Sequence, residues 1–294
     1  MGLIKKSVIA IIMASLSLLI IVYLRQINVI WFDLLMLLFI SVATHELDTA
    51  FRKAGYNTIR PMLYFAVLAF YPMFLLLESK INGFTGGVIT LMISFLIGGV
   101  IMTFNHKYTY KDLAMTAFIL FYPMVLMILF GEVNHNTGGL FGILSVLVIA
   151  IMSDTFAQWI GMLVGGKKLC PEISPKKTVA GAYGAYVGGM VGAAALFFIF
   201  EFFQLFKNVN NVYFTGLTDN ILTSVPIYAG LALLGSTTAQ LGDLFASWLK
   251  RQLNIKDFGS FLPGHGGIMD RADSFIFTMP FFYIVFLFIP NLAL

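Results

Sequence analysis

Cysteine and charge are both scarce in this chain of 294 residues. Cys170 is the only cysteine, which excludes an intramolecular disulfide and a metal site built on several thiolates. Only 11% of the residues are charged, whereas 59% are hydrophobic, and the mean hydropathy is +0.90. These values exclude an ordinary soluble globular domain and are typical of polytopic membrane proteins.

Long apolar runs recur along the whole chain. A transmembrane helix needs roughly 17–25 mostly apolar residues. We predict nine such helices, at residues 7–24, 28–44, 61–78, 86–105, 112–131, 138–164, 180–206, 221–248 and 274–292. The sequence therefore predicts an all-α polytopic integral membrane protein with about nine transmembrane helices.

The basic residues fall mostly on one side of these predicted helices. Of the 18 Lys and Arg residues, all but Arg25, Lys80 and Lys207 lie in the terminus and loops of one side. The positive-inside rule then places the N-terminus in the cytoplasm and the C-terminus outside. Because topology explains the net charge of +4, nucleic acid is not an expected partner.

Polar residues concentrate in two basic loops of the C-terminal half, 165–179 and 249–273. Each loop follows a predicted helix that carries an acid inside its apolar run, Asp154 in one and Asp243 in the other. Charges near lipid must be solvated, paired or bound to an ion, so this concentration predicts a functional site. We expect a polar funnel that opens to the cytoplasm. By contrast, the polar stretch 45–60 is interpreted as an ordinary amphipathic connector at the headgroup level.

Asp243 is the leading candidate for a cation ligand. Asp243, Ser247 and Lys250 stand at i, i+4 and i+7, so they line one face of a helix. Magnesium prefers oxygen donors and commonly takes one or two protein carboxylates plus substrate phosphates. We expect Asp243 and Asp270 to bind it. A structural ion pair with Lys250 or Arg271 is the alternative.

Two more acids are further candidates for the metal site. Asp154 can bind a metal or orient a lysine, and these alternatives stay open. Asp273 precedes the last apolar run, so capping the ninth helix is an alternative role for it.

The turn that contains His265, Gly266 and Gly267 is a candidate phosphate-binding element. Glycines let backbone N–H groups approach a phosphate closely, and Lys250, Arg251 and Arg271 surround the turn in sequence. A second candidate is Ser174 to Thr178 with Lys167, where Thr178 is expected to cap the seventh helix beneath Lys176 and Lys177. That helix carries Gly184, Gly188 and Gly192 at four-residue spacing, which predicts close helix packing.

These residues resemble a known family signature, that of the CDP-diacylglycerol synthases or phosphatidate cytidylyltransferases. The matching positions near the C-terminus are Ser247, Lys250, Arg251, Lys256, Asp257, Pro263, His265, Gly266, Gly267, Asp270, Arg271 and Asp273. The stretch from Asp154 to Gly181 resembles the family's second conserved region. Ala180 and Ala246 stand where members usually have Glu, and Gln158 replaces a common tyrosine.

The resemblance implies a magnesium-dependent reaction of CTP with phosphatidate that gives CDP-diacylglycerol and pyrophosphate. The expected catalytic residues are Asp243, Asp270, Lys250 and Arg271. The expected substrate-binding residues are Lys167, Ser174, Lys176, Lys177, Thr178, Ser247, Arg251, His265, Gly266 and Gly267. A second cation alongside Mg²⁺ and a homodimer are left open.

The chain is expected in the cytoplasmic (inner) membrane, with its active site on the cytoplasmic side. Residues 1–135 are expected to form the first five helices, and residues 136–294 the catalytic region. Two alternatives remain, a cytidylyltransferase that acts on another lipid phosphate and a transporter of phosphorylated solutes.

Overall fold

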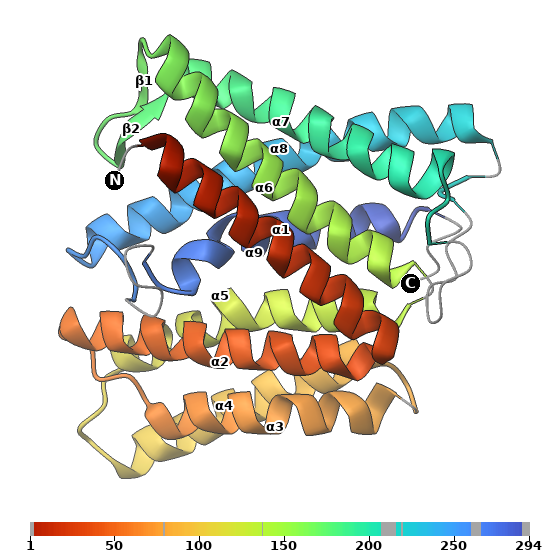
Figure 1. Ribbon diagram of the computed structural model, residues 1–294. Helices are drawn as coiled ribbons and strands as arrows, with labels where there is room; N and C mark the ends of the chain where they lie inside the picture. The colour runs from red at the N-terminus through yellow and green to blue at the C-terminus, as the bar shows by residue number, and fades with distance from the viewer. Residues whose placement is uncertain are drawn as a thin grey trace.

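The computed structural model describes residues 3–78, 80–136, 138–206, 216–218, 220–259 and 266–289. Within these ranges the chain forms a helical bundle with one small hairpin (Figure 1). The elements are α1 (Leu3–Ile27), α2 (Val29–Lys53), α3 (Arg60–Glu78), α4 (Gly83–Phe104), α5 (Tyr110–His135), α6 (Gly139–Val164), β1 (Lys168–Cys170), β2 (Ser174–Thr178), α7 (Val179–Phe197), a π-helical turn (Phe198–Phe202), α8 (Ile221–Gln252) and α9 (Met269–Phe286).

Helices dominate because a backbone within lipid must satisfy its own hydrogen bonds. Seven of the described helices, α2 to α8, are long and apolar enough to cross a membrane. In α1 the stretch Ser15–Ile27 forms a shorter apolar helix. The prediction of an all-α polytopic membrane protein is confirmed. The number of crossings and the orientation of the termini stay predictions.

Each predicted apolar range contains one helix, but α2 extends well beyond its expected end at residue 44. It continues to Lys53, and Glu46 and Asp48 on the added turns are buried. Asp48 accepts a hydrogen bond from Thr58 and pairs with Arg60, with Nε and Oδ2 2.9 Å apart. The interpretation of residues 45–60 as an ordinary connector thus misses that residues 45–53 continue α2 and bury two acids, whereas the depth of this stretch in the membrane stays a prediction.

The glycines of α7 lie against α6, as the four-residue spacing predicts. A Cβ added at Gly184 would lie 2.8 Å from Cβ of Ile160 and 2.9 Å from the backbone oxygen of Phe156. A Cβ at Gly188 would collide with the backbone of Met152. Only glycine permits this approach of the two backbones. The packing prediction is thus confirmed.

The basic loop 165–179 contains the antiparallel hairpin of β1 and β2. Lys168 pairs with Thr178, and Cys170 pairs with Ser174. The backbone N–H of Val179 donates to the carbonyl of Lys167, so the hairpin closes directly onto the start of α7. This element was expected only as a loop.

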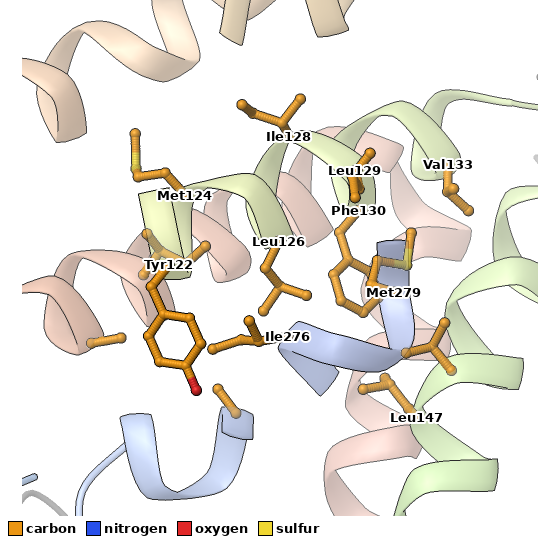
Figure 2. Close-up of a cluster of buried hydrophobic side chains, with 14 of the residues drawn as sticks. Tyr122, Met124, Leu126, Ile128, Leu129, Phe130, Val133, Leu147, Ile276 and Met279 are labelled. Atoms are coloured by element: carbon orange, nitrogen blue, oxygen red, sulfur yellow. The ribbon is translucent and has the colours of Figure 1, made fainter. Parts of the chain in front are cut away.

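The helix α5 lies at the centre of the bundle, in contact with α2, α4, α6 and α9. Figure 2 shows Leu126 and Phe130 of α5 beside Ile276 and Met279 of α9. All four side chains are buried. The first five helices and the C-terminal helices therefore share one apolar core.

A buried polar group joins α1, α2, α3 and α5. Arg25 Nε donates to Asn134 Oδ1 at 3.0 Å, and Asn134 Nδ2 donates to Asp33 Oδ1 at 2.8 Å. The other oxygen of Asp33 accepts from Tyr71 at 3.1 Å and lies 2.7 Å from Nε2 of His135. Mutual hydrogen bonding makes such a group tolerable inside an apolar bundle.

Candidate active site

The elements with the predicted site residues meet at one end of the bundle. In Figure 1 this is the left end, which holds the β1–β2 hairpin, the last turns of α8, the start of α9 and, lower in the view, the end of α2. The helices α6 and α8 each bring one acid to this region, and α9 brings two, Asp270 and Asp273.

Three of these acids, Asp154 on α6, Asp243 on α8 and Asp273 on α9, form an acid cluster. Asp154 and Asp273 each interact electrostatically with Asp243 and with one another. The hydroxyl of Ser274 donates to Asp154 Oδ2 at 2.7 Å, which links α9 to α6. Neighbouring carboxylates repel one another, and bound protons or nearby cations relieve this repulsion.

The start of α9 corrects one expectation for Asp273. The helix begins at Met269, so Asp273 lies inside it and does not cap its first turn. Its Oδ1 accepts the backbone N–H of Ser274 at 2.8 Å, and its side chain is buried. Across from it, a Cβ at Gly242 would collide with the backbone oxygen of Asp273. Gly242 thus sets the close approach of α8 and α9 beside Asp243.

Lysines and an arginine surround the acids. Lys177 Nζ lies 2.6 Å from Asp243 Oδ2, and both side chains are partly exposed. Arg271 interacts electrostatically with Asp154, and Lys250 does so with Asp273. The hydroxyl of Ser247 donates to Asp243 Oδ1 across a long 3.4 Å. The acid and basic residues therefore form one polar cluster, as expected from their positions in sequence.

Asp270 has different partners from Asp243. Its Oδ1 accepts from Lys250 Nζ at 2.8 Å, and its Oδ2 accepts from the backbone N–H groups of Phe258 and Gly267, each at 2.9 Å. The ion pair with Lys250 is the alternative that the sequence left open. Lys250 also lies over the ring of Phe258, 5.3 Å from its centroid.

A cavity of about 310 Å³ opens beside the acid cluster. It is lined by residues of α6, the hairpin, α7 and α8, which are Asp154, Ala157, Gln158, Gly161, Met162, Leu169, Lys176, Lys177, Thr178, Gly181, Ala182, Gln240, Asp243 and Leu244. The helices α6 and α8 contribute its acids, and the hairpin contributes its lysines. Such a cavity suits a polyanion that is held together with a cation.

The hairpin holds its lysines at the cavity through local hydrogen bonds. Thr178 caps α7, since its Oγ1 accepts from the backbone N–H of Gly181 at 3.1 Å, as expected. Arg251 Nε donates to the carbonyl of Ile173 at 3.2 Å, which ties α8 to the hairpin. Lys167 is exposed and does not line the cavity.

The remaining predicted residues lie at the edge of the site. Ser174 is the first residue of β2 and lies outside the cavity lining. Gly266 adopts a φ of +82°, and a Cβ there would lie 3.1 Å from Asp270 Oδ2. His265 lies outside the described residues.

Two residues of the first five helices reach this region, and the sequence did not indicate them. Glu46 accepts the backbone N–H groups of Ile268 and Met269 at the start of α9. Tyr122 of α5 interacts electrostatically with Asp243 and Asp273, and its hydroxyl has no hydrogen-bond partner in the part of the chain that the structure describes. In Figure 2 this hydroxyl points away from α5. The only feature of the sequence that could have indicated Glu46 was the presence of an acid in the polar stretch 45–60.

The donor chemistry of the cluster fits magnesium. Carboxylate oxygens from Asp154, Asp243 and Asp273 and the unpaired hydroxyl of Tyr122 are hard donors. No three Asp, Glu, His or Cys side chains of the described ranges are grouped as a metal site. A magnesium ion here would thus take one or two protein carboxylates, with other ligands from substrate phosphates.

Comparison with known proteins shows the family of this chain. A family model described as the cytidylyltransferase family matches residues 4–289, nearly the whole chain. The chain belongs to the cytidylyltransferase family. The family resemblance that the sequence suggests is thereby confirmed, and the match includes the first five helices, where the sequence alone showed only hydrophobicity.

Named relatives in the cytidylyltransferase family are phosphatidate cytidylyltransferases of bacteria. The protein of Bacillus subtilis (strain 168) is 40% identical over 156 residues, 52% of this chain and 49% of that protein. The protein of Staphylococcus aureus (strain COL) is 33% identical over 192 residues, 65% of this chain and 66% of that protein. The protein of Rickettsia bellii (strain RML369-C) is 42% identical over 132 residues, 45% of this chain and 52% of that protein. The matched segments thus span about half to two thirds of these relatives.

Proposed function

We propose that this protein transfers the cytidylyl group of CTP to phosphatidate, which yields CDP-diacylglycerol and pyrophosphate. The observation that carries the proposal is the cavity that is lined by two acids, Asp154 and Asp243, and two lysines, Lys176 and Lys177. Membership of the cytidylyltransferase family and the names of the bacterial relatives support it.

The proposed reaction forms one bond and breaks another. A phosphate oxygen of phosphatidate attacks the α-phosphorus of CTP, and the bond from that phosphorus to the oxygen bridging to the β-phosphorus breaks. Phosphatidate is already an anion at neutral pH, so no side chain has to act as the nucleophile. Catalysis is then mainly positioning and charge neutralisation, the two tasks that lysines and carboxylates around one cavity can perform.

In this proposal the lysines bind the polyphosphate and the acids bind cations. Lys177 would exchange its contact with Asp243 for a phosphate when substrate enters. Asp243 with Asp154 or Asp273 would hold Mg²⁺, which neutralises charge on the α-phosphate and the leaving pyrophosphate. The assignment of Asp270 to the same metal site remains part of the proposal, with Lys250 as its present partner.

The proposal also places the protein in its cell. The cavity would face the cytoplasm, where CTP is found, and phosphatidate would enter from the cytoplasmic membrane of the bacterial cell. The excess of Lys and Arg in the loops on that side supports this orientation. A homodimer is compatible with the exposed apolar helix faces, which lipid would otherwise cover.

The decisive experiment measures pyrophosphate release by detergent-purified protein supplied with CTP and phosphatidate, with and without magnesium. We expect release only when all three are present. Folded protein that releases pyrophosphate only with another lipid phosphate would reassign the acceptor. CTP-independent uptake of a phosphorylated solute into vesicles, without pyrophosphate release, would overturn the enzymatic proposal in favour of transport.

A further inference from the structure

We propose that Glu46 of α2 is a positioning residue for the active site, because it binds the first backbone N–H groups of α9 and lies against both described ends of the α8–α9 connection. This inference rests on the proposed function only for its activity readout. Glu46 lies 222 residues before Ile268 in the sequence, on a helix that carries none of the predicted site residues.

Both carboxylate oxygens of Glu46 accept backbone N–H groups of α9. Oε1 accepts from Ile268 at 3.2 Å, and Oε2 accepts from Met269 at 2.9 Å. Ile268 occupies the N-cap position of α9 and has no side chain that can accept a hydrogen bond. The first amides of a helix need acceptors, and a negative charge at this end is stabilised by the helix dipole. Glu46 therefore supplies the cap that the local sequence lacks.

Two glycines show how tightly the carboxylate is enclosed. A Cβ added at Gly259 or at Gly267 would collide with the Glu46 carboxylate, at a distance well under the 3.0 Å minimum of real Cβ contacts. Gly259 follows α8, and Gly267 precedes α9. The carboxylate thus sits between the two described ends of the connection, and neither end can carry a side chain there.

The same two ends hold Asp270. Its Oδ2 accepts from Phe258, the neighbour of Gly259, and from Gly267, while its Oδ1 pairs with Lys250. Glu46 and Asp270 therefore both lie against the backbone of these two ends. Displacement of this backbone would move Asp270 and, one turn further along α9, Asp273 and Ser274.

The anchor itself is firm. Glu46 is 7% exposed, and α2 contacts both α5 and α9. Two residues later, Asp48 pairs with Arg60 and accepts from Thr58, which fixes the α2–α3 connection. Asp48 is buried on the same helix, but Arg60 and Thr58 belong to the α2–α3 side of the bundle and do not contact α9 through it. It therefore provides a matched control for the loss of a buried acid from α2.

The test compares the variants Glu46→Gln and Asp48→Asn in the full-length protein in detergent. Glutamine has the size of glutamate, but its NH2 group cannot accept an N–H of α9. We expect Glu46→Gln to lower kcat/KM for CTP at least tenfold, mostly through kcat. Asp48→Asn is expected to keep kcat/KM within threefold of wild type. Glu46→Asp keeps the charge on a shorter stem and should recover part of the loss.

Hydrogen–deuterium exchange supplies a readout that does not depend on turnover. Peptides that cover residues 254–275 should exchange faster in Glu46→Gln, with α6 and α7 unchanged, whereas Asp48→Asn should affect only residues 48–60. An exchange rate at residues 254–275 of Glu46→Gln equal to that of wild type would refute the proposal. Faster exchange throughout the chain would also refute it, because Glu46 would then stabilise the whole fold and not this connection. If wild-type protein itself has no activity, the proposed function fails while the exchange result still decides the role of Glu46.

Discussion

Replacing Gly242 by alanine tests whether the close approach of α8 and α9 organises the acid cluster. A Cβ at this position would lie well under 3.0 Å from the backbone oxygen of Asp273 and 3.2 Å from Cβ of Phe277. The nearest obstacle is backbone, so it cannot rotate away as a flexible side chain would. Relief of the overlap requires α8 and α9 to separate by about 0.5–1 Å, since packed interiors have little free space.

This separation acts directly on the site, because Asp243 follows Gly242 and faces Asp273 across the two helices. A misplacement of about 1 Å can cost about 10²-fold in rate. We expect Gly242→Ala to lower kcat/KM by about 10- to 100-fold. Overpacking costs about 1–3 kcal/mol, while alanine gains up to about 1 kcal/mol over glycine in a helix, so the net loss of stability should stay near 2 kcal/mol or less.

The same helix offers a matched control. Gly230 of α8 has nothing within 4 Å of an added Cβ. Gly230→Ala should therefore keep full activity and gain up to about 1 kcal/mol from helix propensity. Pyrophosphate release and thermal unfolding in detergent measure both effects. Folded Gly242→Ala protein with activity within twofold of wild type would refute the claim that the separation of α8 and α9 controls the site.

Two further predictions concern single polar groups. Asp243→Asn and Asp270→Asn should each abolish pyrophosphate release while the protein stays folded, because asparagine removes the charge facing Lys177 or Lys250; substantial activity in either variant would remove that residue from the metal site. Tyr122→Phe should leave the melting temperature unchanged or slightly raised, because an unpaired buried hydroxyl costs about 1–3 kcal/mol. The same variant should lower kcat/KM about three- to tenfold, because it removes one hydrogen bond from the Tyr122 hydroxyl to the ligand bound in the active site. A wild-type rate would exclude that hydrogen bond.

The architecture was largely predictable because lipid imposes a simple rule on sequence. A helix that crosses lipid satisfies its own backbone hydrogen bonds and has an apolar surface, so each one appears in the sequence as a long apolar run that can be recognised separately. Short sequence patterns also gave correct predictions where the structural feature is set by residues a few positions apart. Thr178 caps the helix that follows it, and Gly184 and Gly188 pack against α6. Both predictions depend on neighbours a few residues apart.

The largest error comes from an acid whose partner is distant in sequence. Residues 45–53 look like a solvated connector, yet Asp48 is buried and pairs with Arg60 of the polar stretch 45–60, and Glu46 is buried against the start of α9. The last helix begins at Met269 because Glu46 caps it. An acceptor 222 residues away leaves no pattern in the local sequence, so the first turn of α9 was expected to lie in a loop.

The two halves of the chain cooperate in positioning α9. The predicted division at residue 135 separates apolar helices from the residues that carry chemistry, but α9 contacts both α2 and α5 of the first half. Glu46 holds the first turn of α9, and the apolar side chains of α5 cover its later turns, as Figure 2 shows. A helix that carries Asp270 and Asp273 is thus held by elements that carry neither. Precise placement of charge inside a membrane requires rigid support, so the first five helices contribute to the site through geometry.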